Sequence, residues 1–307
     1  MIRLYSILAA VVLLWACDNP KKIGQEPDEP DTTELSLTGT GDFNFNSYSP
    51  LSDMPVRIFY HIPEKAMSHS AALMVFHGAG RDAKESRDAL IAKSNQFQVV
   101  IIVPEFSNEY YRGSDAYNLG NIFTDGDRPS AETLNPEEEW TFSIIDPLFD
   151  FFREKTGLVS DEYDVFGHSA GAQFAHRFLF FKPDARHKRV VSASAGWYTM
   201  PDPSVNFPYG LKKSPLESSS LQTVFAAPLT VIVGLKDNDP NASSLRHNSQ
   251  ADAQGDDRLE RAQYFYYQSL QLAQTANLDF GWKYQSLPNV DHDFNATSTA
   301  AANILYK

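Results

Sequence analysis

Short apolar runs alternate with longer amphipathic segments from about residue 39 to residue 307. Several of these runs are continuously apolar and rich in β-branched residues, as expected for parallel strands that are covered on both faces. The runs that predict strands are 55–62, 72–76, 99–103, 163–166, 190–194, 229–233 and 282–287. Alternation of such strands with helices predicts an α/β fold, with a doubly wound, mostly parallel sheet and helices on both faces.

One helix is predicted in detail after residue 135. Asn135 can cap its start, Pro136 fits the first helical position, and the glutamates at 137–139 suit the positive end of the helix dipole. Gly157 supplies the stop, and we expect Pro147 to kink the helix. Apolar residues recur every four positions between these points, at Trp140, Ile144, Leu148 and Phe152.

The first residues have a different pattern. Arg3 precedes an apolar run over 7–15, which is shorter than the ~20 residues of a membrane-spanning helix. This arrangement is typical of a signal peptide, predicted over 1–16. Leu14-Trp15-Ala16-Cys17 resembles a bacterial lipobox, so Cys17 is the predicted lipidation site. We therefore expect a lipid-anchored protein of the bacterial cell envelope, in the periplasm or on the outer surface, with ordinary secretion as the alternative.

Two further regions complete the predicted organisation. Residues 17–38 are rich in Pro, Asp and Glu and almost free of apolar residues, which predicts a disordered acidic tether. Residues 39–307 show no repeat and no second break in composition, so they are expected to form one catalytic domain.

Composition and charge argue against several kinds of binding site. The chain has 307 residues and a formal net charge of −13, which speaks against a surface that binds nucleic acid. Its single Cys excludes an internal disulfide and a Cys-based zinc site. The acidic clusters lack the spacing of a calcium loop. We therefore expect neither a metal nor another cofactor, and the membrane is a partner only through the lipid anchor.

The strongest motif is Gly167-His168-Ser169-Ala170-Gly171, which lies between the predicted strand 163–166 and an apolar helical segment. A G-x-S-x-G sequence in this context is typical of a sharp strand-to-helix turn that lifts a serine hydroxyl above the sheet. Flanking glycines are needed there because they carry no Cβ atoms that would clash. Ser169 is therefore the candidate nucleophile.

A serine nucleophile needs a histidine base that a carboxylate orients. In this architecture the acid follows a later strand and the histidine comes last in the chain. Asp237 lies in the turn after 229–233; we prefer it to Asp239, which precedes Pro240 and can be a solvated turn residue. A helix over 258–273 and the strand 282–287 come next, and His292 in the following loop is the candidate base.

The oxyanion of a tetrahedral intermediate needs two backbone amides. One is expected from Ala170, the residue after the nucleophile. The other is expected from His77-Gly78-Ala79-Gly80, which follows the strand 72–76, with Ala79 as the first choice and Gly80 as the second.

Residues 55–295 resemble an α/β-hydrolase. Residues 161–172 (DEYDVFGHSAGA) are similar to the elbow of the esterase branch that includes poly(3-hydroxybutyrate) depolymerase-like enzymes and carbohydrate acyl-esterases. The resemblance implies that Ser169, Asp237 and His292 are nucleophile, acid and base, with Ala79 and Ala170 as oxyanion donors. The sequence departs from depolymerase-like relatives at Ala79, where they often have Cys.

Long aromatic-rich loop insertions are expected over the active site, because long loops in compact domains are usually functional. Tyr110, Tyr111 and Tyr117 follow the strand 99–103, and Trp197 and Tyr198 follow the strand 190–194. These rings are candidate substrate-binding residues for a sugar or an aromatic acyl group. The alternative is that they fill a small cap.

These features predict a serine esterase that cleaves a carboxylic ester, either a carbohydrate-linked acyl ester or a polyester, through an acyl-enzyme. The substrate can be a small molecule or a polymer. One alternative is a serine peptidase of the same fold, and another is a non-catalytic glycan-binding lipoprotein. The sequence predicts no particular oligomeric state.

Overall fold

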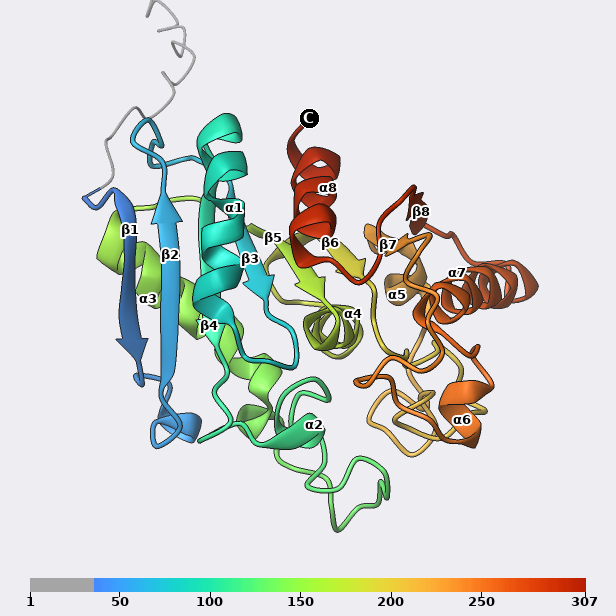
Figure 1. The fold of residues 1–307 in the computed structure, drawn as a ribbon. Coiled ribbons are helices and arrows are strands. Elements are labelled where there is room, and N and C mark those ends of the chain that lie inside the picture. The colour runs from blue at the N-terminus through green and yellow to red at the C-terminus, as the bar shows by residue number, and fades with distance from the viewer. Residues whose placement is uncertain (1–35) are drawn as a thin grey trace, which may run out of the picture. The chain divides into compact units, whose positions relative to one another are not determined.

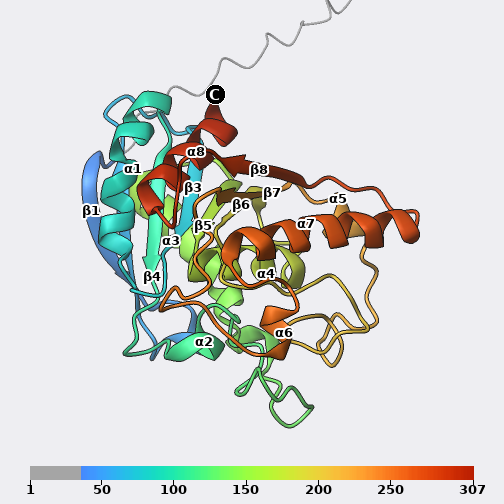
Figure 2. The ribbon, with the colours of Figure 1, turned by 45° about the vertical axis from the view of Figure 1, so that its right-hand side comes forward.

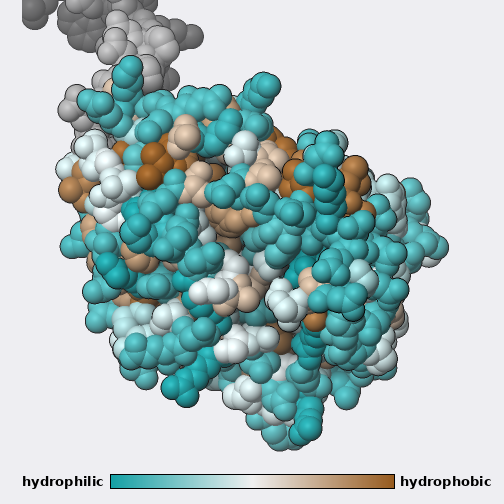
Figure 3. Space-filling model, in the orientation of Figure 1, coloured by the Kyte–Doolittle hydropathy of each residue, from teal (hydrophilic) through white to brown (hydrophobic). Residues whose placement is uncertain are grey.

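The computed structural model describes residues 36–307. The predicted signal peptide, Cys17 and residues 17–35 of the predicted tether lie outside the described residues. Within 36–307, no helix is both long enough and apolar enough to cross a membrane. Hydrophilic side chains cover most of the face shown in Figure 3.

An eight-stranded sheet forms the centre of the described residues, in the order β1-β2-β4-β3-β5-β6-β7-β8 (Figure 1). β2 pairs antiparallel with β1 and β4, and all other neighbours are parallel. Each of the seven predicted strands is present, within a few residues of its expected bounds. The strands are β1 (Gly39–Phe45), β2 (Val56–Ile62), β3 (Ala72–Phe76), β4 (Val100–Glu105), β5 (Tyr163–His168), β6 (His187–Ala193), β7 (Leu229–Gly234) and β8 (Lys283–Leu287).

Helices cover both faces of the sheet, which confirms the predicted doubly wound α/β fold (Figures 1 and 2). Alternate side chains of β3 show this directly. Leu73 and Val75 pack in a cluster with α1 and α8, whereas Met74 and Phe76 pack in a second cluster with α3, α4 and α7. The helices are α1 (Ala83–Phe97), α2 (Gly113–Ala116), α3 (Ile145–Thr156), α4 (Ala170–Phe181), α5 (Gln222–Ala226), α6 (Ser249–Asp252), α7 (Arg258–Thr275) and α8 (Phe294–Tyr306).

The start of the helix predicted after residue 135 is wrong. The short 3₁₀ helices η2 (Glu137–Glu139) and η3 (Thr141–Ile144) occupy that segment, and the extended backbone of Trp140 separates them (φ −67°, ψ 139°). α3 begins only at Ile145, so Pro147 lies in its first turn. The amides of a first turn have no partner within the helix, so a proline there removes no hydrogen bond of the helix. The reason for expecting a kink at Pro147 therefore does not apply. The predicted stop is confirmed, since Gly157 caps α3 with φ 80°.

Two glycines allow α4 to pack closely on the strands that precede it. A Cβ atom at Gly171 would overlap the carbonyl oxygen of Phe76 in β3, and one at Gly167 would overlap the carbonyl oxygen of Gly171. Both obstacles are backbone atoms, which cannot move aside as a flexible side chain would. The absence of a side chain at these positions therefore sets the distance between α4 and the sheet, and with it the height of the intervening turn.

Replacing Gly171 by Ala is expected to lower the free energy of unfolding by about 3 kcal/mol, because the new methyl group must displace backbone of β3. Urea denaturation monitored by circular dichroism measures this change. Gly78→Ala is the matched control, since the nearest atom to its new Cβ would be a carboxylate oxygen of Asp82 at an ordinary 3.9 Å. The control should change the free energy of unfolding by less than about 1 kcal/mol. Equal stability of the two variants would contradict the close approach.

Candidate active site

Ser169 occupies the turn between β5 and α4. Its backbone has φ 57° and ψ −115°, a conformation that non-glycine residues rarely adopt. Such strain persists only where the surrounding structure enforces it. Here the amide of Ser169 donates to the carbonyl of Ala193 in β6, and helix α4 begins at the very next residue. The serine hydroxyl is thereby held at the carboxyl edge of the sheet, beside the amino-terminal end of a helix.

Three predicted residues from separate loops meet at this edge. Ser169 Oγ lies 3.1 Å from His292 Nε2, and His292 Nδ1 lies 2.8 Å from Asp237 Oδ2. Because the Asp237 carboxylate accepts the Nδ1 proton, Nε2 is left to accept the proton of the Ser169 hydroxyl. The loop after β7 supplies Asp237, and the loop between β8 and α8 supplies His292. The arrangement has the connectivity of a nucleophile, a general base and an orienting acid.

Asp237 and Asp239 have different environments. Asp237 is 4% exposed, and its Oδ1 lies 3.5 Å from Arg258 Nη1 at the start of α7. Burial alone would raise the pKa of Asp237, but the hydrogen bond and charge of His292 and the charge of Arg258 outweigh burial and lower that pKa. Asp239 is exposed and accepts the amide of Asn241, as a turn residue does. Of the two candidate acids, only Asp237 contacts His292.

His168, the variable residue of the G-x-S-x-G motif, packs against the candidate base. Its ring centroid lies 4.6 Å from that of His292, and its Nδ1 lies 3.1 Å from the hydroxyl of Thr297 in α8. Burial, followed by the neighbouring charge of His292, lowers the pKa of His168 to about 3. A neutral imidazole at this position supports the His292 ring from one side without placing a second cation beside it.

The buried neutral histidine predicts a pH dependence of stability. Its pKa is 6.5 as an unperturbed group and about 3 when folded, so below pH 6.5 the unfolded chain binds a proton that the folded chain does not. Stability therefore falls as the pH decreases from 6.5 towards 3, by up to about 1.4 kcal/mol per pH unit for this group. Urea denaturation at a series of pH values measures this dependence. The slope of the free energy of unfolding against pH should be shallower for His168→Gln than for the parent. An unchanged slope would contradict a neutral buried His168.

The predicted oxyanion donors lie together. Ala79 and Ala170 both line a pocket of about 420 Å³. The preceding Gly78 is so close to the nucleophile that a Cβ atom built on it would lie 4.0 Å from the Cβ of Ser169. Gly80, the second choice, is not among the lining residues. The two predicted donors therefore line one pocket, and both loops lie next to Ser169.

The structure contradicts the expectation that Tyr111, Tyr117 and Tyr198 contact a substrate. Their exposed fractions are 0%, 1% and 0%, so none of the three rings reaches a ligand. Trp197 is also buried, at 3% exposed, but it lines the pocket beside Ala79 and Ala170. Tyr110 is 37% exposed and does not line that pocket. The alternative, that the aromatic residues of these loops fill a cap, holds for the three buried tyrosines.

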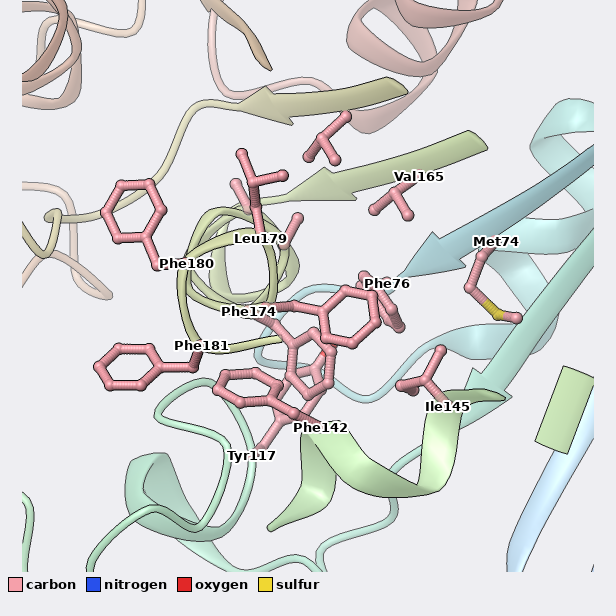
Figure 4. Packing of buried hydrophobic residues seen from close by; sticks show 14 of the residues in the cluster. Met74, Phe76, Tyr117, Phe142, Ile145, Val165, Phe174, Leu179, Phe180 and Phe181 are labelled. Atoms are coloured by element: carbon pink, nitrogen blue, oxygen red, sulfur yellow. The ribbon is translucent and has the colours of Figure 1, made fainter. Parts of the chain in front are cut away.

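One of the buried tyrosines, Tyr117, connects helix α4 to the loop that carries Ala79. Tyr117 stacks on Phe174 of α4 with ring centroids 5.4 Å apart, in the cluster shown in Figure 4. Its hydroxyl donates to the carbonyl of His77, at the start of the loop that carries Ala79. His77 is itself fixed, because Nδ1 donates to the carbonyl of Gly78 and Nε2 accepts the amide of Phe106. Tyr117 therefore anchors the loop of one predicted oxyanion donor.

Several residues of the site were not found from the sequence. Arg258 approaches Asp237, and its Nη2 donates to Ser244 in the pocket wall. Gln173 and Arg246 line the pocket. A charged first residue of a helix, or a polar residue one turn into it, is common at helix starts, so no local pattern singles these residues out. Only the spatial arrangement of the loops reveals them.

No group of three or more His, Cys, Asp or Glu side chains that could hold a metal ion occurs among residues 36–307.

No protein-family model matches the chain, and no curated protein matches it significantly. Solved structures do. Poly(aspartic acid) hydrolase-1 from Sphingomonas sp. KT-1 is 37% identical, with a TM-score of 0.82 over 88% of this chain and 99% of its own. The poly(3-hydroxybutyrate) depolymerase LpqC from Bordetella parapertussis is 28% identical, with a TM-score of 0.81 over 88% of this chain and 90% of its own. An S-formylglutathione hydrolase from Agrobacterium tumefaciens, 14% identical with a TM-score of 0.56, shares the fold.

The chain belongs to the α/β-hydrolase superfamily, and within it to the esterase branch that the sequence resembles. It is accordingly a hydrolase of the esterase type.

Proposed function

We propose that this chain is a serine hydrolase that cleaves a carboxylic ester through an acyl-enzyme. The observation that supports the proposal most strongly is the unbroken chain of hydrogen-bonding contacts from Asp237 to His292 to Ser169, with distances of 2.8 and 3.1 Å. Those distances are within the reach needed for proton transfer between a nucleophile and its base. The contacts end beside a pocket that can receive a substrate.

In the first half of the reaction Ser169 Oγ bonds to the carbonyl carbon while its proton moves to His292 Nε2. The electron pair of the C=O double bond moves to the oxygen, and the amides of Ala79 and Ala170 stabilise the negative charge that forms there. When the intermediate collapses, the ester C–O bond breaks and the leaving alcohol takes the proton from Nε2. Water then attacks the acyl-enzyme by the same steps and releases the acid, which restores Ser169.

The substrate is a small-molecule or polymeric ester. Names of two relatives support a polymer, since one is a poly(aspartic acid) hydrolase and the other a poly(3-hydroxybutyrate) depolymerase. Poly(aspartic acid) is a polymer of an amino acid, so hydrolysis of an amide is the second candidate. The remaining candidate is a glycan-binding protein without activity. A lipid anchor at Cys17, after removal of residues 1–16, would place the enzyme at the cell envelope, with secretion as the alternative.

Assays of purified protein on p-nitrophenyl acetate and on acetyl, feruloyl and hydroxyalkanoate esters test the proposal. Poly(aspartic acid) is included as the amide substrate. Turnover of at least one ester, faster than that of the amide polymer, is the expected result. Cleavage of the amide polymer alone would favour the second candidate, and no turnover of any substrate would favour the glycan binder.

A further inference from the structure

The pocket beside Ser169 contains an arginine that is held in place but has unused donors. Arg246 Nη2 donates to the carboxylate of Asp127, at 2.7 Å from Oδ1. Its guanidinium carbon lies 5.1 Å from the ring centroid of Trp197 and 5.6 Å from that of Tyr209. Among residues 36–307, Nη2 is the one nitrogen of this guanidinium that has an acceptor, and the side chain is 28% exposed. The two rings thus preorganise a planar cation that can bind a further acceptor.

A second arginine, Arg177, packs on the ring of Trp197 and has no carboxylate partner among the described residues. Arg177 is fully buried, and its guanidinium carbon lies 4.2 Å from the ring centroid of Trp197. It donates to the hydroxyl of Thr199 and to the carbonyls of Asn118 and Gln173, while its Nη2 has no partner. A buried cation with neutral partners leaves a positive potential that the protein has not neutralised.

Two residues that accept hydrogen bonds from Arg177, Asn118 and Gln173, also line the pocket. Gln173 Oε1 accepts from Asn118 Nδ2 at 2.8 Å and lies 3.4 Å from Arg177 Nη1. Because its oxygen is engaged, Gln173 is left with its Nε2 donor, which has no acceptor within residues 36–307. Gln173, Asn118 and Arg246 all line the pocket. Gln173 Nε2 is therefore a donor that a ligand in the pocket can use.

Two carboxylates, Asp127 and Asp115, also line the pocket and would repel a bound anion, although each already has a hydrogen-bond donor as a partner. Asp127 is 55% exposed and already shows how Arg246 binds a carboxylate. Asp115 accepts the amide of Gly126, and burial, reinforced by the charges of Asp127 and Asp125, raises its pKa. A substrate carboxylate can replace the exposed Asp127 at Arg246 at small cost, since exposed ion pairs are weak.

We propose that this pocket is a carboxylate-binding subsite in which Arg246 binds, and Arg177 attracts, a negatively charged group of the substrate. The inference rests on the proposed function and narrows it, because it makes the substrate an ester that carries a carboxylate. Ala79 and Ala170 line the same pocket, so the bound carboxylate would lie on one side of the ester carbonyl. That side is either the acyl part or the alcohol part of the substrate.

Two pairs of esters distinguish the sides. Mono-p-nitrophenyl adipate against p-nitrophenyl hexanoate places the carboxylate in the acyl part, and 3-carboxyphenyl acetate against phenyl acetate places it in the leaving alcohol. The parent enzyme should prefer the charged ester in one pair by about tenfold in kcat/KM, and this preference should fall with added salt. The pair that shows it identifies the side.

Variants of the ion pair should move this preference in opposite directions. Arg246→Gln should bring the ratio of kcat/KM for the charged and neutral esters close to one. Asp127→Asn removes the competing carboxylate and should raise the ratio several-fold. Arg186 and Asp150 form the matched control, because this pair has nearly the same exposure, 25% and 60%, but lies away from the pocket. Arg186→Gln and Asp150→Asn should leave the ratio unchanged.

The outcomes separate this inference from the proposed function. Turnover of the neutral esters with no preference in either pair would overturn the carboxylate subsite alone, as would an unchanged ratio in Arg246→Gln. Failure of a fluorophosphonate to label Ser169, with no ester turned over, would overturn both.

Discussion

Replacing Ser169 by Ala is expected to lower kcat on p-nitrophenyl acetate by a factor on the order of 10⁴ to 10⁶. The variant keeps the pocket and the predicted oxyanion donors, Ala79 and Ala170, but has no oxygen to attack the carbonyl. Single-turnover and steady-state assays measure the loss. The fold should survive, because the backbone strain at Ser169 comes from the turn and not from its hydroxyl.

Ser219→Ala is the control for this change. Ser219 is exposed and lies in the loop before α5, so its replacement should leave kcat unchanged. Thermal unfolding of all three proteins shows whether a loss of rate reflects a loss of structure. Similar rates for Ser169→Ala and the parent would contradict the mechanism.

Asp237→Asn is expected to lower kcat by a factor on the order of 10⁴. An asparagine at this position donates its amide proton to His292 Nδ1, so the proton of the neutral ring moves to Nε2. A protonated Nε2 can no longer accept the proton of Ser169. The buried Arg258 also loses the carboxylate that lies 3.5 Å away. Steady-state assays on the same ester, together with urea denaturation, separate the catalytic effect from any effect on stability.

Asp239→Asn is the matched control, because it makes the same chemical change two residues away. Its carboxylate is exposed and bonds only to the amide of Asn241 among the described residues. The control should retain nearly full activity. A larger loss in Asp239→Asn than in Asp237→Asn would reverse the assignment of the acid.

The strands and the order of site residues could be predicted from the sequence because both depend on local patterns. Runs such as 72–76 and 229–233 are apolar enough to be buried on both faces, and those of β3 and β7 are. The glycines at 167 and 171 report a close approach that admits no side chain. β1 was not predicted, because its sequence GTGDFNF has few apolar residues and forms an edge strand that pairs only with β2.

Other features depend on contacts between distant segments, which periodicity does not report. Tyr117 and Trp197 both follow strands in aromatic loops, yet the ring of Tyr117 is covered by Phe174 and that of Trp197 lines the pocket. Likewise, Arg177 is a buried cation and Arg246 a pocket cation only because several loops converge. The start of α3 was missed because local capping residues were outweighed by 3₁₀ turns that carry Trp140 into the core.

Reaction with a fluorophosphonate probe, followed by mass spectrometry of the digested protein, tests the central claim most directly. The probe forms a covalent bond only with a serine whose hydroxyl is activated. We expect one equivalent of label on the peptide that contains Ser169, lost in Ser169→Ala and strongly slowed in Asp237→Asn. An unlabelled Ser169 in the folded protein, or label of equal intensity on other serines, would contradict the account.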